Sequence, residues 1–206
     1  MLLEIHPDNP DKRKITQVVQ CLKGGGVIVF PTDTIYALGC DIYNTKAFEK
    51  VCRLKGVKPE HANFSFIMSD LRNIALFTKP FDRSVFKLLN RSLPGPYTFV
   101  LNANSEVPAI FRAKKKSIGI RIPGNNIAKQ LVMEMGNPIM ATSLHDLDLI
   151  KEYPVDATEI YERYEHDVDI IIDGGIGSNI PSTIIDCTGG EPLVVREGLG
   201  SLMVME

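Results

Sequence analysis

Cysteine is scarce in this sequence and shows no metal-binding spacing. The four cysteines stand at positions 21, 40, 52 and 187, without a CxxC pair and without a histidine pair nearby. A structural zinc site is therefore not expected. So few cysteines, beside seven methionines, are typical of a chain kept in a reducing cytosol, and we expect a cytoplasmic protein.

Long apolar runs are missing as well. No stretch approaches the 18 residues that suggest a membrane-spanning helix. The N-terminal segment MLLEIHPDNP carries an acid at Glu4 and turn-forming residues from position 7, which is unlike a secretory signal peptide. We therefore expect no membrane partner.

An excess of charge of either sign is also absent. Lys and Arg number 23 against 25 Asp and Glu, a formal net charge of −2, so the overall balance does not predict nucleic-acid binding. Any basic surface must be local: Arg53, Lys55 and Lys58 lie close together, and Lys114–Lys116 form a run. The run reads most simply as a solvated loop, and RNA phosphate contacts are the other interpretation.

Several catalytic signatures are absent from the chain. It contains no HExxH, no GxSxG and no GxxxxGK[ST], which excludes a zincin helix, a nucleophile elbow and a Walker-type phosphate loop. The four histidines lack metal-ligand spacing, so we predict no protein-bound metal. The triple glycine at 24–26 precedes a strand instead of following one, and it indicates the end of a helix, not a dinucleotide fingerprint.

The remaining pattern predicts one α/β domain over residues 1–206, with a mixed sheet, because helices and strands are interleaved without repeats or a linker. The predicted helices are 11–22, 45–55, 70–77, 81–91, 125–136 and 158–164. The predicted strands are 2–5, 27–30, 64–68, 97–101, 117–122, 138–142, 168–172, 183–186 and 193–196, the last two forming a hairpin around Gly189-Gly190.

The stretch from Gly24 to Asp41 is the centre of this pattern. Residues 27–30, VIVF, are typical of a strand buried on both faces, and Pro31 should end its pairing. Thr32, Asp33 and Thr34 follow at the exit of that strand, where ligands bind in open α/β sheets. An ordinary turn beginning at the proline explains the same residues equally well.

Polar residues near several other strand ends complete the candidate set. They are Lys55, Lys58, Ser65, Thr98, Arg121, Thr142, Ser143, Ser182, Thr183 and Arg196. Each has an ordinary explanation by itself, such as a charge at a helix end or a hydroxyl in a loop. Together they predict a cleft for an anionic ligand, since Arg and Lys bind phosphate and carboxylate. Such a cleft needs no protein nucleophile in a nucleotidyl transfer that uses Mg²⁺.

Six motifs resemble the YrdC family in the same order along residues 24–198. They are PTDTIYALGCD (31–41), LPGPYTFVL (93–101), IGIRIP (118–123), ATS (141–143), PSTIIDCT (181–188) and VVREG (194–198). The resemblance implies an open twisted mixed sheet with flanking helices and a large concave cleft. It also implies threonylcarbamoyl-AMP synthase activity, which uses L-threonine, bicarbonate and ATP with Mg²⁺, releases pyrophosphate, and serves threonylcarbamoyladenosine synthesis in tRNA.

The resemblance also assigns roles to individual residues. Threonine binding falls on Thr34, Tyr36, Arg121 and Thr142. Nucleotide binding falls on Lys55, Lys58, Thr98, Ser143, Ser182 and Arg196, and the catalytic positions are Lys55 and Ser143.

Two positions depart from the synthase pattern. Val57 stands where the family's Lys-x-Arg motif has arginine, and His145 stands where its Ser-x-Asn motif has asparagine. Val57 cannot make a charge-assisted contact, and the adjacent Lys58 lacks the bidentate geometry of arginine. These departures are similar to the YciO branch of the family. A second hypothesis therefore stays open, a double-stranded RNA- or tRNA-binding protein without synthase activity, because binding double-stranded RNA has also been described for the family.

Overall fold

The computed structural model describes residues 1–112, 116–144 and 153–205. The helices are α1 (Lys12–Lys23), α2 (Thr45–Leu54), α3 (Ile74–Phe77), α4 (Arg83–Ser92), α5 (Ala109–Arg112), α6 (Asn126–Met135) and α7 (Ala157–Tyr164), with 3-10 turns η1 (Pro59–His61), η2 (Leu71–Asn73) and η3 (Leu202–Met205). The strands are β1 (Leu2–Glu4), β2 (Ile28–Phe30), β3 (Ala37–Asp41), β4 (Ser65–Ile67), β5 (Tyr97–Asn102), β6 (Ser117–Arg121), β7 (Ile139–Ser143), β8 (Ile170–Asp173), β9 (Thr183–Asp186) and β10 (Leu193–Arg196).

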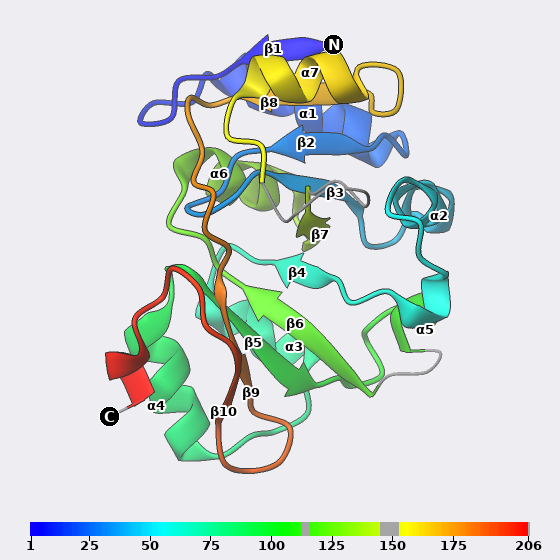
Figure 1. The fold of residues 1–206 in the computed structure, drawn as a ribbon. Coiled ribbons are helices and arrows are strands. Elements are labelled where there is room, and N and C mark those ends of the chain that lie inside the picture. Colours follow the sequence, from blue (N-terminus) through cyan, green and yellow to red (C-terminus); the bar gives the residue numbers. More distant parts are fainter. Residues whose placement is uncertain (113–115, 145–152, 206) are drawn as a thin grey trace.

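These strands form one twisted sheet in the order β1-β8-β2-β3-β7-β4-β6-β5-β9-β10, which runs from top to bottom in Figure 1. The pairs β1–β8, β2–β8, β4–β6 and β5–β9 are parallel, and the other neighbours are antiparallel. The predicted mixed sheet is therefore confirmed, as is the β9–β10 hairpin.

Both faces of the central strand β2 are covered, as its sequence predicts. Ile28 and Phe30 point into one apolar cluster, which includes residues of α1 and α6. Val27 and Val29 point into a second cluster on the other side, with residues of α2 and α4. Each of these side chains is fully buried, and burying one contributes about 1.5–3 kcal/mol.

Side-chain caps fix the helix starts. Asp11 Oδ1 accepts hydrogen bonds from the backbone N–H groups of Arg13 and Lys14, at 2.8 and 3.3 Å, so Asp11 is the N-cap of α1. Asn44 and Asn125 accept in the same way at the starts of α2 and α6. Such caps satisfy backbone donors that have no partner within the helix.

The strand β3 was not predicted from the sequence. It pairs antiparallel with β2, so that Ile28 lies opposite Gly39 and Phe30 opposite Ala37. The turn after Pro31 is therefore the connection of a hairpin inside the sheet. A Cβ on Gly39 would lie 2.8 Å from the Phe30 ring and 2.9 Å from the Met140 carbonyl oxygen, so close packing requires glycine there. The sequence also did not predict the short helix α5 in the 102–116 connection.

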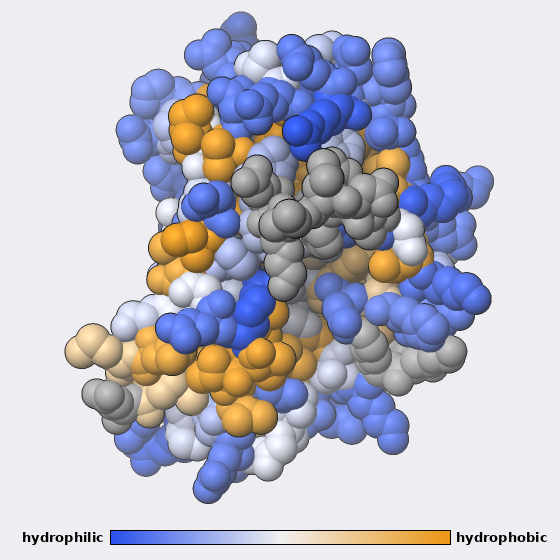
Figure 2. Space-filling view, viewed as in Figure 1, coloured by the Kyte–Doolittle hydropathy of each residue, from blue (hydrophilic) through white to orange (hydrophobic). Residues whose placement is uncertain are grey.

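Apolar side chains gather on one surface, over β10 and the C-terminal segment, as Figure 2 shows in orange. Leu193, Val195 and Met203 are 67%, 60% and 75% exposed. The segment beyond β10 is held to the sheet, because Thr183 Oγ1 donates to the Gly200 carbonyl oxygen at 2.7 Å. Within the described ranges, no helix has the length and apolar character needed to cross a bilayer.

Candidate functional site

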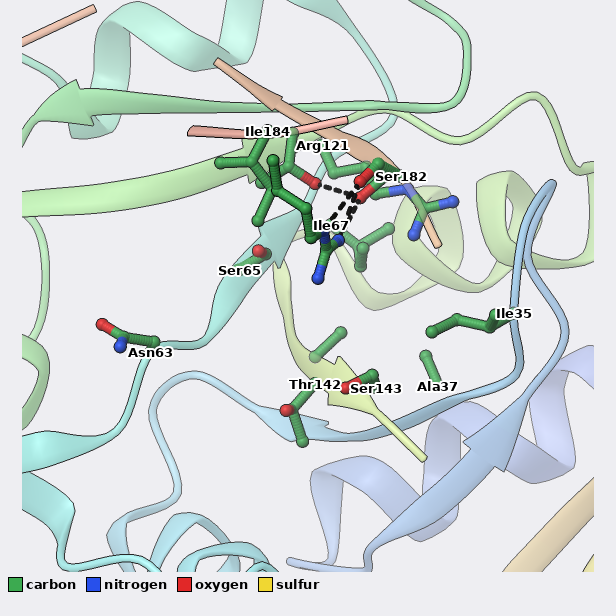
Figure 3. A pocket seen from close by; sticks show the side chains of 13 residues that line it. Ile35, Ala37, Asn63, Ser65, Ile67, Arg121, Thr142, Ser143, Ser182 and Ile184 are labelled. Atoms are coloured by element: carbon green, nitrogen blue, oxygen red, sulfur yellow. Dashed lines mark hydrogen bonds between the residues drawn. The ribbon is translucent and has the colours of Figure 1, made fainter. Parts of the chain in front are cut away.

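A hollow of about 110 Å³ lies over the middle of the sheet, between the β3–β7 strands and the β4–β6–β5 strands (Figure 3). Its lining comes from seven strands and the segments beside them. The lining residues are Ile35, Ala37, Asn63, Ser65, Ile67, Thr98, Arg121, Ala141, Thr142, Ser143, Ser182, Ile184 and Arg196. Seven of the predicted candidate residues are thus brought together: Ser65, Thr98, Arg121, Thr142, Ser143, Ser182 and Arg196.

Arg121, the last residue of β6, is 7% exposed and is anchored by the turn after β2. Its Nη2 donates to Thr32 Oγ1 at 3.1 Å and to Asp33 Oδ1 and Thr34 Oγ1 at 2.5 Å each. The other carboxylate oxygen of Asp33 accepts from the Gly124 backbone N–H at 2.9 Å. The turn and the end of β6 are therefore locked together around one guanidinium group.

Arg196 of β10 lines the same hollow and contacts Ser182. Its Nε and Nη2 donate to the Ser182 carbonyl oxygen at 3.2 and 2.8 Å. The Ser182 hydroxyl shares a hydrogen bond of 2.8 Å with Thr98 Oγ1, which joins the start of β9 to β5. Two hydroxyls and a second guanidinium group are thus fixed beside one another (Figure 3).

The two arginines are close enough to affect each other electrostatically. Burial lowers the pKa of Arg121, the carboxylate of Asp33 raises it, and the positive charge of Arg196 lowers it further. Both guanidinium groups stay protonated, because arginine does not release its proton at physiological pH. Two like charges beside hydroxyl donors make the hollow a favourable place for an anion.

Lys55, directly after α2, lies next to this hollow but does not line it. Its Nζ donates to the Ser143 carbonyl oxygen at 2.9 Å, and Ser143 is a lining residue. The side chain is 7% exposed, and burial lowers the pKa of Lys55 to about 8. The ammonium group is therefore one residue removed from the hollow and close to its own titration at neutral pH.

A second hollow of about 290 Å³ adjoins the first, since Asn63, Ser65, Thr98 and Ile184 line both. Its remaining walls include several apolar side chains: Phe64, Phe66, Val100, Phe111, Ile118 and Val195. The rings of Phe66 and Phe111 meet edge to face with centroids 5.1 Å apart. The site therefore has a polar, cationic part and an apolar, aromatic part.

Besides Lys55, three more residues to which the family resemblance assigns a role do not line the first hollow. Thr34 is 1% exposed and serves as an acceptor for Arg121. Tyr36 is equally buried: its hydroxyl donates to the Gly175 carbonyl oxygen at 2.6 Å, and burial raises the pKa of Tyr36 to about 12. Lys58 is exposed just before η1. A direct ligand contact of these three residues stays a prediction.

Two departures from the synthase pattern can be placed only in part. Val57 packs, half-buried, against the larger apolar cluster, so the position leaves the hollow without an additional cation. His145 lies outside the described residues. Asn63, Ile35 and Ile67 line the hollow without having been predicted. Ile35 belongs to the motif at 31–41, whereas the sequence signal of Asn63 and Ile67 was a position beside a strand or within one.

Carboxylates are absent from the described lining of the first hollow. Across the parts of the chain that the structure describes, no three His, Cys, Asp or Glu side chains gather in a way that would hold a metal ion. A divalent ion in this hollow would therefore depend on oxygen atoms of the ligand.

Comparisons with known proteins agree with the fold and with the motifs. The model of the Sua5/YciO/YrdC family, described as "Telomere recombination", matches residues 20–198. The uncharacterized protein YciO of Escherichia coli (strain K12) is 42% identical over 199 residues, 96% of this chain and 95% of that protein. The crystal structure of E. coli YciO superimposes over 100% of this chain and 99% of that chain, with a TM-score of 0.92 and 40% identity.

Synthases of the same family are more distant. The threonylcarbamoyl-AMP synthase of Coxiella burnetii (strain RSA 493 / Nine Mile phase I) is 28% identical over 183 residues, 88% of this chain and 96% of that protein. P. abyssi Sua5 complexed with L-threonine gives a TM-score of 0.87 at 25% identity, over 96% of this chain and 57% of that chain. The YrdC fold and the likeness to YciO predicted from the sequence are confirmed, and the chain belongs to the Sua5/YciO/YrdC family.

Proposed function

We propose that this protein is a nucleotidyltransferase of the threonylcarbamoyl-AMP synthase type that acts in tRNA threonylcarbamoyladenosine modification. It would combine L-threonine, bicarbonate and ATP into threonylcarbamoyl-AMP, with release of pyrophosphate and water. One observation carries the proposal: two guanidinium groups, from Arg121 and Arg196, share a hollow with the hydroxyls of Thr98 and Ser182. An anionic group of a substrate bound between the two arginines would attract both guanidinium groups and offset their mutual repulsion.

The two parts of the site suit the two larger substrates, L-threonine and ATP. Arg121 and Thr142 both line the polar hollow and would hold the carboxylate and hydroxyl of the amino acid. Ser182, Thr98 and Arg196 would hold the phosphates. The Arg121 guanidinium group, which lies close enough to Arg196 for the two charges to interact, would attract the phosphates as well. The adjoining apolar hollow, with its phenylalanine rings, would take the adenine base, because planar rings pack well against aromatic side chains.

The reaction needs positioning and charge neutralisation more than a protein nucleophile. The amine of threonine first forms a carbamate with bicarbonate, and water leaves. A carbamate oxygen then attacks the α-phosphorus of ATP; the new O–P bond forms as the bond to the β-phosphate oxygen breaks and pyrophosphate leaves. The arginines and the Lys55 ammonium would stabilise the negative charge that gathers on these oxygens, and Ser143 would orient the reacting groups as a lining residue.

Mg²⁺ would enter as part of the MgATP substrate. The nearest carboxylate to Arg121, Asp33, already has both oxygens engaged by protein donors, so the described side chains do not supply a carboxylate for the ion. The proposal therefore assigns Mg²⁺ to the phosphates and no protein ligand to it.

RNA binding is less well supported by the site geometry. Arg121 is 7% exposed, and a side chain so deeply buried cannot reach the backbone phosphates of a duplex. Arg53, Lys58 and Lys116 are exposed and would have to carry that function. Binding to duplex RNA through them would weaken with salt, with a log–log slope of roughly −0.7 to −0.9 per phosphate contact.

The decisive test of the proposed function is pyrophosphate release by the purified protein with MgATP and bicarbonate, in the presence and absence of L-threonine. The proposal requires release that depends on threonine, and mass spectrometry should detect threonylcarbamoyl-AMP. MgATP binding without threonine-dependent release would contradict the choice of threonine. Absence of MgATP binding would contradict the nucleotide site itself.

A further inference from the structure

Asp33 does not line the polar hollow, and each of its carboxylate oxygens accepts a hydrogen bond from a protein donor. One carboxylate oxygen is 2.5 Å from Arg121 Nη2, and the other accepts from the Gly124 backbone N–H at 2.9 Å. The Asp33 side chain is 13% exposed, and that of Arg121 is 8% exposed. Asp33 is also absent from the described lining of the polar hollow. It is therefore placed to act on Arg121 and not on a substrate.

The hydrogen bonds that Arg121 donates to described residues come from one end of its guanidinium group. Within the described part of the chain, Nη2 is the nitrogen that donates, and its three acceptors come from the consecutive residues Thr32, Asp33 and Thr34. The buried Nε has no hydrogen-bond partner there. A guanidinium group carries five N–H donors, so anchoring through Nη2 leaves the others for a ligand.

The charges around Arg121 also link Asp33 to this guanidinium group. The positive charge of Arg196 disfavours the charged form of Arg121, whereas the carboxylate of Asp33 favours it. Asp33 itself would repel an anionic substrate. Its direct effect on anion binding and its effect through Arg121 therefore have opposite signs, which makes them separable by experiment.

We propose that Asp33 is a positioning residue for substrate binding: it holds the Arg121 guanidinium group in the orientation that presents its remaining N–H donors to the substrate anion. This inference rests on the proposed function in assigning Arg121 to a substrate anion. It excludes direct contact of Asp33 with substrate or with Mg²⁺.

A double-mutant cycle tests this role, with MgATP and inorganic pyrophosphate as probes in isothermal titration calorimetry. Asp33→Asn should weaken binding of the two anions by about 10- to 100-fold, the range of one charge-assisted hydrogen bond. In an Arg121→Met background, the same Asp33→Asn change should leave the affinity unchanged or raise it, because only the repulsion by the carboxylate is removed. Adenosine, which is uncharged, should bind all four proteins alike.

An equal loss of affinity in the two backgrounds would overturn the proposal, since Asp33 would then act without Arg121, as a direct ligand would. Asp82→Asn is the matched control, because Asp82 is exposed before α4 and makes no side-chain capping bond. This variant should bind both anions like the wild type.

A second substitution keeps the proposal testable if the Asp33→Asn variant does not fold. Asp33→Glu keeps the charge but displaces the carboxylate, and it should weaken pyrophosphate binding by about 3- to 10-fold, part of the same hydrogen-bond range; wild-type affinity in this variant would contradict the positioning role. Failure of the proposed function is seen separately, as pyrophosphate binding that depends on Arg121 without threonine-dependent turnover. Wild-type protein that binds neither anion would contradict both proposals.

Discussion

Lys55 gives the proposed site a titration near neutral pH. Burial lowers the pKa of Lys55 to about 8, and its Nζ lies 2.9 Å from the carbonyl oxygen of Ser143, a residue of the polar hollow. The ammonium form attracts a bound phosphate, whereas the neutral amine does not. MgATP affinity should therefore be highest below the pKa of Lys55 and should fall as the pH rises through that pKa.

The size of this effect follows from the pKa. Between pH 7 and pH 9, the protonated fraction of a group with a pKa of about 8 falls from about 0.9 to about 0.1. Binding that requires the ammonium form would therefore weaken by about ten-fold, or about 1.4 kcal/mol. Burial raises the pKa of Cys52 and Cys187 to about 11 and that of Tyr36 to about 12, so these three side chains do not titrate in this interval.

The measurement is calorimetric titration with MgATP at half-unit steps from pH 7 to pH 9. Lys55→Arg should give a nearly constant affinity, because an arginine stays charged throughout. Lys46→Arg is the matched control and should keep the wild-type slope, since Lys46 is exposed on α2 and outside the hollow. A wild-type affinity that is constant across the range would refute the coupling of Lys55 to the ligand, as would an unchanged slope in Lys55→Arg.

Three further predictions concern binding, activity and stability. Arg121→Ala should weaken MgATP binding by about 10- to 100-fold, the range of a charge-assisted hydrogen bond; equal affinity in equilibrium dialysis would contradict the site assignment. Val57→Arg combined with His145→Asn should raise threonine-dependent pyrophosphate release in a coupled assay, and no gain would mean that these two departures do not limit activity. Gly39→Ala should cost about 1–3 kcal/mol, because its Cβ would lie 2.9 Å from a carbonyl oxygen, and the Tm should fall by about 2–12 °C in a thermal scan; an unchanged Tm would show that the sheet accommodates the methyl group.

The elements with strong local signals were predictable from the sequence. The helix after Asp11 has a capping carboxylate and apolar residues at Ile15, Val18, Val19 and Leu22, all of which are buried. The strand β2 was predictable because four consecutive branched or aromatic residues suit burial on two faces. The strand β3 was not, because ALGCD consists largely of small residues and contains a glycine. Its strand conformation depends on pairing with β2 and with β7, and β7 is distant along the chain.

The candidate site shows the same division. Thr98, Arg121 and Ser182 were identified from motifs and strand ends, and the sheet brings them to one hollow. Thr34 and Tyr36 belong to an equally strong motif, yet their hydroxyls are turned toward protein partners. A motif gives the order of residues, whereas the direction of each side chain is set by the hairpin that carries it.

The β9–β10 hairpin has a consequence for the order of events during synthesis. Ser182 and Arg196 reach the hollow from the last part of the sequence, and Arg121 meets Arg196 only when β10 has paired with β9. A nascent chain that ends before β10 has the first guanidinium group without the second. Ligand binding stabilises only states that bind the ligand, so substrates would protect the finished protein against unfolding and proteolysis while giving little protection to incomplete chains. Cells that contain abundant substrate would therefore retain full-length molecules in preference to truncated ones.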